Sequence, residues 1–102
     1  MMKQFYYEFN ENEYYGLIAV SVEEDDLKTN PYKKATEFYV EYIGGETVEE
    51  VLDEAHPNLR TKEYAFMKFM YAPNHLDDNV KILIEQFEET TNGVLLIDGS
   101  LI

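Results

Sequence analysis

Residues 3–9 alternate between aromatic and polar side chains, and this alternation constrains the fold more than any other feature of the chain. The two sets are Phe5, Tyr7 and Phe9 on one side and Gln4, Tyr6 and Glu8 on the other. A period of two residues is that of a half-buried β-strand. A polar run at 10–13 and a run rich in β-branched and aromatic residues at 14–22 follow. We therefore expect an antiparallel hairpin whose second strand turns Ile18, Val20 and Val22 toward the core.

The segment after the hairpin carries two conflicting signals. Residues 23–26 are four consecutive carboxylates, which repel one another and end the second strand. Asn30 and Pro31 then favour a helix start, whereas residues 36–43 alternate and have strand propensity. We interpret 30–43 as a strand, with a helix as the open alternative.

Two helices are expected in the middle of the chain. After the break at Gly44 and Gly45, Thr47 and Glu50 form a capping box. Apolar residues follow at i, i+3, i+4 and i+7, which predicts an amphipathic helix that ends before Pro57. A second helix is expected from residue 61 or 62 to 71, although 64–71 is apolar enough to be a buried strand.

The last third of the chain predicts one more helix and one more strand. Asn74 can cap a helix, and Gly93 is expected to end it. The buried stripe of this helix would consist of Leu76, Val80, Leu83 and Phe87. Residues 94–97 then predict a buried strand, and 98–99 a turn.

These elements predict one α+β domain over residues 1–102. Its sheet would be antiparallel or mixed, built from the N-terminal hairpin plus later strands and packed by two or three helices. The sequence shows no repeat and no linker that would divide it. An apolar content of 45% is too high for a disordered acidic chain. No apolar run exceeds four residues, which is far too short to cross a bilayer.

Charge and cysteine content indicate the compartment and the partners. The chain has no cysteine, so neither disulfides nor thiol chemistry is possible, and we expect a cytoplasmic location. Its formal net charge is −13, from 21 acidic and 8 basic residues. Such a field repels nucleic acid and anionic lipid and attracts basic proteins. A basic protein partner is therefore expected, without direct binding of nucleic acid or membrane; the open alternative is that the charge serves solubility alone.

No motif in the sequence dictates a reaction. Glycine-rich phosphate loops, the zinc-protease helix motif and the hydrolase serine elbow are all missing. Ser21 falls within a predicted strand, and Ser100 lies close to the last residue, so neither is placed as a nucleophile. We expect no catalytic residue, no cofactor and no enzymatic activity.

The two histidines suggest an alternative, a small metal-dependent or ligand-binding module. His56 lies close to Asp53, and His75 precedes Asp77 and Asp78. A closed metal site generally needs three or four convergent ligands. We interpret these residues instead as groups that complement helix ends, His56 in the last turn of its helix, and expect no metal site.

An aromatic surface is the first candidate for partner binding. The alternation that buries Phe5 and Tyr7 would leave other side chains together on the outer face of the sheet, rimmed by Glu8, Glu37 and Glu41. The candidate anchors are Tyr6, Tyr15, Leu17 and Tyr39. Exposed tyrosine is enriched at binding hot spots. The alternative is that helices cover this face as well, which would make it ordinary core.

An acidic helix face is the second candidate. The helix at 47–55 carries acidic residues on its solvent side with no basic residue among them, namely Glu46, Glu49, Glu50, Asp53 and Glu54. Helix neighbours three and four residues apart lie about 5–6 Å apart, so this stripe repels itself unless a cationic partner neutralises it. A small basic group, Arg60, Lys62 and Lys68, follows it. We interpret that group as pairing with acidic helices, since three cations do not overcome the charge of the whole chain.

The short, acidic, cysteine-free and tyrosine-rich composition resembles that of small bacterial and phage proteins, among them immunity proteins and phage-encoded inhibitors. The resemblance rests on composition alone. It implies a non-enzymatic module of the inhibitor, immunity or adaptor type, derived from a phage or mobile element. We expect it to bind a basic partner through Glu49, Glu50, Asp53 and Glu54, with the tyrosine face as anchor. A structural homo-oligomer, joined through the tyrosine face or the C-terminal strand, is a further alternative.

Overall fold

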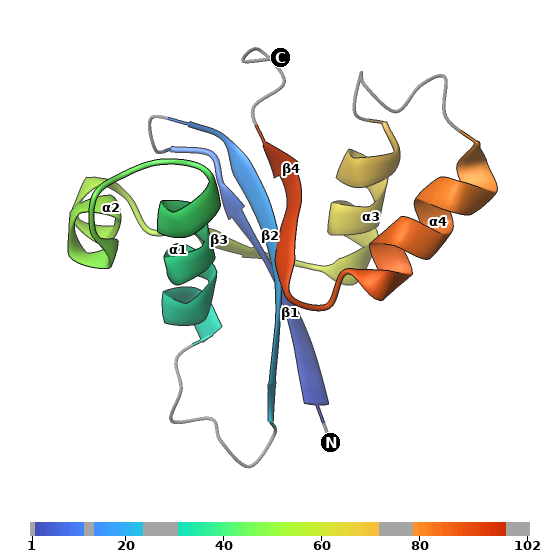
Figure 1. Ribbon diagram of the computed structural model, residues 1–102, viewed down its shortest axis with the longest axis horizontal. Helices are drawn as coiled ribbons and strands as arrows, with labels where there is room; N and C mark the ends of the chain where they lie inside the picture. The colour runs from blue at the N-terminus through green and yellow to red at the C-terminus, as the bar shows by residue number, and fades with distance from the viewer. Residues whose placement is uncertain (1, 12–13, 24–30, 72–78, 98–102) are drawn as a thin grey trace.

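A four-stranded antiparallel sheet forms the middle layer of the fold (Figure 1). The computed structural model describes residues 2–11, 14–23, 31–71 and 79–97. Strands β1 (Met2–Phe9) and β2 (Gly16–Glu23) form the predicted hairpin, in a register that runs from Met2↔Glu23 to Phe9↔Gly16. Strand β3 (Asn58–Arg60) pairs with β1 and β4 (Gly93–Ile97) with β2, which gives the order β3-β1-β2-β4. The α+β fold expected from the sequence is confirmed.

Two helix pairs cover the two faces of this sheet (Figure 1). Helices α1 (Pro31–Tyr42) and α2 (Val48–Glu54) lie on one side. Helices α3 (Lys62–Met70) and α4 (Val80–Glu89) lie on the other. The central strand β2 is therefore buried along its whole length except at Glu23. The described part of the chain has four helices, where the sequence predicted two or three.

Each face of the sheet has its own apolar core. Toward α1 and α2 the buried residues are Tyr7, Phe9, Ile18, Val20, Ala35, Tyr39 and Val51. Toward α3 and α4 they are Tyr6, Leu17, Ala19, Ala65, Phe69, Leu83, Phe87 and Leu95. The prediction that Ile18, Val20 and Val22 face inward is confirmed, since all three are buried.

The interpretation of residues 30–43 as a strand is wrong, because α1 occupies 31–42. Pro31 takes the first helical position, where its missing N–H costs nothing. Ala35, Thr36 and Tyr39 are buried at helical spacing. The Thr36 hydroxyl donates to the Tyr32 carbonyl at 2.7 Å, which satisfies it within the helix. Packing of one helical stripe on β2 therefore outweighs the strand propensity of the aromatic residues.

The connection from α1 to α2 requires a glycine at position 45. Gly45 has a φ of 95°, in the left-handed region that favours glycine. A Cβ atom there would lie 2.6 Å from Cγ2 of Val51. The predicted N-cap of α2 is confirmed, since the Glu50 N–H donates to Oγ1 of Thr47 at 3.2 Å. His56 follows the C-cap Ala55, and so lies beyond the last turn in which it was expected.

The remaining elements agree only partly with expectation. The expected helix at 61–71 is confirmed as α3, which spans residues 62–70 between the caps Thr61 and Tyr71, and the alternative strand is not formed. Helix α4 is capped by Asn79 and followed by Thr90, whereas Gly93 begins β4, so the role of Gly93 as helix stop is wrong. Leu83 and Phe87 are buried, but Val80 is exposed. The expected cap Asn74, together with Leu76 and the turn at 98–99, lies outside the described residues.

Strand β3 was not anticipated from the sequence. It lies between α2 and α3 in the chain, and its three residues pair with Tyr6, Tyr7 and Glu8 of β1.

None of the helices in the described part of the chain has the length and apolar character needed to span a bilayer.

Candidate functional site

A buried carboxylate lies beneath α3, on the face of the sheet that the sequence pattern predicted to be outside. Glu8 of β1 is only 1% exposed. It shares this face with Tyr6, because residues two apart on a strand point to the same side. Burial of an unpaired carboxylate is very costly, so Glu8 requires partners.

Three side chains supply the short hydrogen bonds to Glu8, and Nδ2 of Asn10 adds a longer one to Oε1 at 3.5 Å. The Tyr15 hydroxyl, from just before β2, donates to Oε2 of Glu8 at 2.7 Å. The Tyr64 hydroxyl of α3 lies 2.9 and 3.0 Å from the two carboxylate oxygens. Nε of Arg60, at the end of β3, donates to Oε1 at 2.9 Å. The guanidinium carbon of Arg60 also lies 4.8 Å from the centre of the Tyr64 ring.

The electrostatics of this cluster favour an ionised Glu8. Burial is the largest single influence and acts to raise the pKa of Glu8, but hydrogen bonds from Tyr15, Tyr64 and Arg60 together lower that pKa below its usual value. Burial and the negative Glu8 raise the pKa of both Tyr15 and Tyr64. The two hydroxyls therefore stay protonated and continue to donate at neutral pH.

The hydrogen bonds around Glu8 hold several strands and helices in place, and the cluster is poorly suited to general-base catalysis. A general base needs a pKa near neutrality and a free lone pair toward its substrate. Glu8 has a lowered pKa, and both of its oxygens already accept hydrogen bonds. The cluster instead joins β1, β3 and α3 to the turn before β2.

The structure corrects the predicted aromatic surface. Tyr6 and Leu17 are buried under α3 and α4, and Tyr15 is half-buried with its hydroxyl on Glu8. Tyr39 belongs to α1 and is buried on the opposite face of the sheet, where its hydroxyl donates to the Tyr14 carbonyl at 2.7 Å. The expectation that these four side chains form one exposed face is wrong, because helices cover both sides of the sheet. A partner could reach Tyr6, Leu17 and Tyr39 only if helices moved away.

The residues that sequence reasoning missed are Glu8 as a core group and Tyr64 as its partner. A signal was available in β2, where Leu17, Ile18, Ala19 and Val20 are consecutive and apolar. A strand that is apolar on both faces is typical of a sheet covered on both sides. This pattern predicts that Glu8 is buried between the sheet and a helix layer.

The acidic side chains predicted on the second helix are where the sequence placed them. Glu46, Glu49, Glu50, Asp53 and Glu54 are all exposed, on α2 and the turn before it. Within the residues that the structure describes, none of them takes part in an ion pair. Glu49 and Glu50 lie in the first turn, where the helix dipole favours negative charge. Asp53 and Glu54 lie at the other end, which has no basic residue in its last turn.

The three basic residues after α2 make separate contacts. Arg60 binds the buried Glu8, which is in β1 rather than in an acidic helix. Nζ of Lys62 lies 3.4 Å from Oε2 of Glu88 on α4, as expected, and both side chains are 55% exposed. Lys68 lies over the Tyr64 ring, 5.7 Å from its centre.

The described residues offer no geometry for the metal alternative. His56 packs edge-on against Tyr32, with ring centres 5.9 Å apart. In residues 2–11, 14–23, 31–71 and 79–97, no group of three or more His, Asp or Glu side chains is arranged to hold a metal ion. His75, Asp77 and Asp78 lie outside these ranges.

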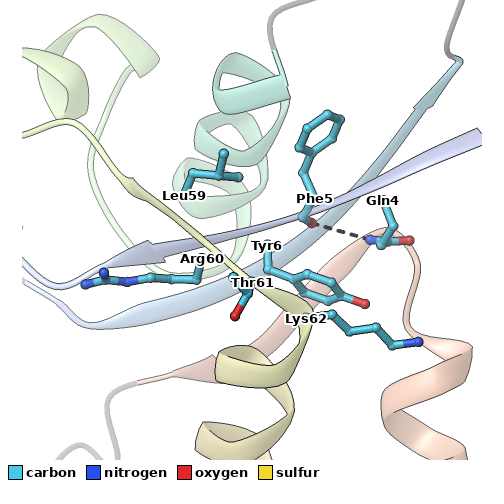
Figure 2. A pocket seen from close by; sticks show the side chains of 7 residues that line it. All are labelled: Gln4, Phe5, Tyr6, Leu59, Arg60, Thr61 and Lys62. Carbon is cyan, nitrogen blue, oxygen red and sulfur yellow. Dashed lines mark hydrogen bonds between the residues drawn. The ribbon is translucent and has the colours of Figure 1, made fainter.

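Two shallow hollows lie near the two edges of the sheet. One, of about 370 Å³, lies where β3 ends beside β1, and Figure 2 shows its lining side chains. These are Gln4, Phe5, Tyr6, Leu59, Arg60, Thr61 and Lys62. The other, of about 300 Å³, lies between α1 and β4 and is lined by Phe38, Tyr42, Asn92, Gly93, Val94 and Ile97.

Fold and site together define a three-layer α+β domain built around a hydrogen-bonded, buried carboxylate. The family model described as the YosH C-terminal domain matches residues 4–96, nearly the whole chain. The chain therefore belongs to the YosH C-terminal domain family. No curated protein and no solved structure matches it.

Proposed function

We propose that this domain is a non-enzymatic, cytoplasmic protein-binding module of the inhibitor, immunity or adaptor type, which engages a basic surface of its partner. The observation that carries the proposal is the acidic face of α2, defined as Glu46, Glu49, Glu50, Asp53 and Glu54. All five carboxylates are exposed, and no described cation neutralises them.

Electrostatics explains why such a face suits binding. Exposed charges of one sign raise the local concentration of an oppositely charged partner and speed its association, with little change in the fold that carries them. The self-repulsion of neighbouring carboxylates along α2 is relieved when a cationic surface covers them. The buried tyrosines have no part in this proposal, and the acidic face acts without them.

A matched pair of variants tests the proposal. In the first, Glu49→Gln, Glu50→Gln, Asp53→Asn and Glu54→Gln neutralise α2. In the control, Glu11→Gln, Glu63→Gln, Glu85→Gln and Glu89→Gln remove the same charge from exposed positions elsewhere. Tagged wild-type protein is used to capture partners from the lysate of the native host, with elution by rising salt, and the captured protein is then purified.

We expect a basic protein whose association rate falls at least about tenfold with the α2 variant at low ionic strength, and much less with the control. The difference should shrink as salt is added, because screening removes long-range attraction. Equal rates for the two variants, or capture of no specific protein, would contradict the proposal.

Self-association is a second candidate, favoured by exposed apolar side chains on the opposite layer. Met67, Tyr71, Val80, Ile82 and Ile84 are all exposed, and all lie on or at the end of α3 and α4. Sedimentation velocity over a range of concentrations tests this candidate. A dimer that Met67→Lys and Ile84→Lys dissociate would support it, whereas a monomer at all concentrations would exclude it.

A further inference from the structure

Strand β1 is paired along only half of its outer edge. Its eight residues all pair with β2, but β3 pairs only with Tyr6, Tyr7 and Glu8. The chain then turns away at Thr61 and enters α3. Among the described residues, no strand pairs with Met2–Phe5 on this side. Backbone groups at an open edge are ready to pair with another extended chain.

The hollow of about 370 Å³ lies at this open edge. It is lined by Gln4–Tyr6 of β1 and by 59–62, the segment in which β3 ends and α3 begins. An added extended segment placed there would continue the line of β3 along β1.

The two sides of the edge differ in chemistry, as Figure 2 shows. Phe5 and Leu59 project to the side of α1, and Leu59 is 58% exposed. Tyr6 and Lys62 project to the side of α3. An added strand would alternate its own side chains between these two environments, because successive residues point to opposite faces. One face therefore accepts apolar side chains and the other accepts polar ones.

Two of the side chains that line the hollow are basic, and each has an acidic partner beside the hollow: Arg60 is bound to Glu8 and Lys62 to Glu88. The lining residues include no acidic residue, and Lys3 is exposed two residues before Phe5 on β1, so it lies on the Phe5 side of the edge. Within the described part of the chain, Lys62 forms an ion pair with Glu88 in which both side chains are 55% exposed, and such an exposed pair contributes little to stability. An acidic side chain on the occupant can therefore replace Glu88.

We propose that the open edge of β1 binds an extended segment of a partner protein, in which apolar and acidic side chains alternate, by adding it to the sheet in line with β3. This proposal goes beyond the proposed function because it uses a different surface of the domain. The segment bound at β1 is acidic, whereas the partner surface bound by α2 is basic. The edge at β4 is a weaker candidate because Leu95 forms a bulge between Val94 and Leu96, a feature that disrupts regular pairing.

The test uses short fluorescein-labelled peptides and fluorescence anisotropy with the full chain. The probe is an acetylated peptide of eight alternating glutamates and valines. Its two controls are the lysine–valine peptide and a glutamate–valine peptide in which prolines replace two valines, since proline removes the N–H that strand pairing needs. The protein variants are Lys3→Glu with Lys62→Glu, and the matched control Lys33→Glu with Lys81→Glu, whose lysines are equally exposed on α1 and α4.

We expect only the glutamate–valine peptide to bind, and the Lys3→Glu/Lys62→Glu variant to weaken this binding at least about tenfold more than the control variant. Bound peptide should also slow hydrogen exchange of the amides of residues 3–5. The variant neutralised on α2 should bind the peptide as wild type does. Failure of the proposed function would therefore be distinguishable from failure of peptide binding at β1.

Several outcomes would overturn the proposal. These are no binding of the glutamate–valine peptide, equal binding of the proline peptide, tighter binding of the lysine peptide, and equal effects of the two lysine variants. Protection that appears at 93–97 instead of 3–5 would place the peptide on the β4 edge and would also overturn it.

Discussion

The α1/α2 layer and the α3/α4 layer pack on opposite faces of one sheet, yet they differ both outside and inside. Residues 31–56 carry seven acidic and two basic side chains, whereas α3 and α4 together carry four acidic and three basic ones. Large apolar side chains are exposed mainly on α3 and α4. Inside, the contrast is reversed, because the α1/α2 side of β1 is lined by aromatic rings and the other side holds the ionised Glu8.

This difference shows that surface charge and core polarity are set independently in the two layers. The α1/α2 layer has an apolar interior and can carry many exterior charges without losing a specific contact. The α3/α4 layer is joined to the sheet by directional hydrogen bonds to Glu8 as well as by packing. Such a network fixes where α3 sits, because each donor has a defined geometry.

The largest expected effects come from removing one aromatic ring from each core. Phe9 and Phe87 are both almost fully buried, and Phe87 stacks on Tyr6 with ring centres 5.6 Å apart. We expect Phe9→Ala and Phe87→Ala each to lower the free energy of unfolding by about 3–5 kcal/mol, measured by chemical denaturation. A loss below about 1 kcal/mol for Phe87→Ala alone would mean that the α3/α4 layer is peripheral to the fold.

The next effect comes from the buried carboxylate. Glu8→Ala leaves the Arg60 charge and the hydroxyls of Tyr15 and Tyr64 without their acceptor, so we expect a loss of about 3 kcal/mol. Arg60 is 32% exposed and can be partly solvated, which keeps the loss at the lower end for a buried pair. The exposed Glu37→Ala is the control and should change stability by less than about 0.5 kcal/mol. Similar values for the two would show that the network adds nothing to the fold.

The pH dependence of stability should distinguish Glu8 from the surface carboxylates. The pKa of Glu8 is lowered in the folded protein, so its contribution is present above the ordinary glutamate pKa and is lost as pH falls through that value toward the folded one. We expect the stability gap between wild type and Glu8→Gln to be widest at neutral pH and to narrow as pH falls below the ordinary glutamate pKa. A gap that stays constant with pH would mean that folding does not change the pKa of Glu8, and a gap that widens as pH falls would mean that folding raises this pKa.

The smallest expected effects are at the helix caps, one on each side of the sheet. The hydroxyl oxygens of Thr47 and Thr61 accept the N–H of Glu50 at 3.2 Å and of Tyr64 at 3.1 Å. Thr47→Ala and Thr61→Ala should each cost about 1 kcal/mol, and the serine variants much less. If Thr61→Ala also shifts the NMR signals of the Tyr64 ring while Thr47→Ala changes stability only, the cap of α3 helps to position the Glu8 network. Identical effects of the two variants would mean that the cap of α3 does not help to position the Glu8 network.

Much of the local structure follows from short stretches of sequence. The hairpin of β1 and β2, the cap and extent of α2 and the strand at 94–97 depend on alternation, on a capping box and on a short apolar run. Each of these signals acts between residues close in the chain. The exposed acidic face of α2 was predictable for the same reason, because a helix with a few apolar positions must turn its charges to water.

The candidate site at Glu8 was not predictable in this way. Its partners Tyr15, Arg60 and Tyr64 come from three other elements, and only the pairing of β3 with β1 brings them together. The same holds for the helix at 31–42, where strand propensity and helical spacing conflict until packing on β2 decides between them.

The sequence by itself therefore determined the fold class, the hairpin, three of the helices and the acidic surface, since these depend on local propensity and on the balance of charge. Only the tertiary structure decided that both faces of the hairpin are buried and how the open edge of β1 arises. The alternation predicts that the two faces of a strand differ in polarity. Whether the polar face contacts water or a second layer depends on the helices that the rest of the chain forms. A glutamate between aromatic residues can occupy either place, and here the hydrogen bonds from distant residues make the interior the more favourable one.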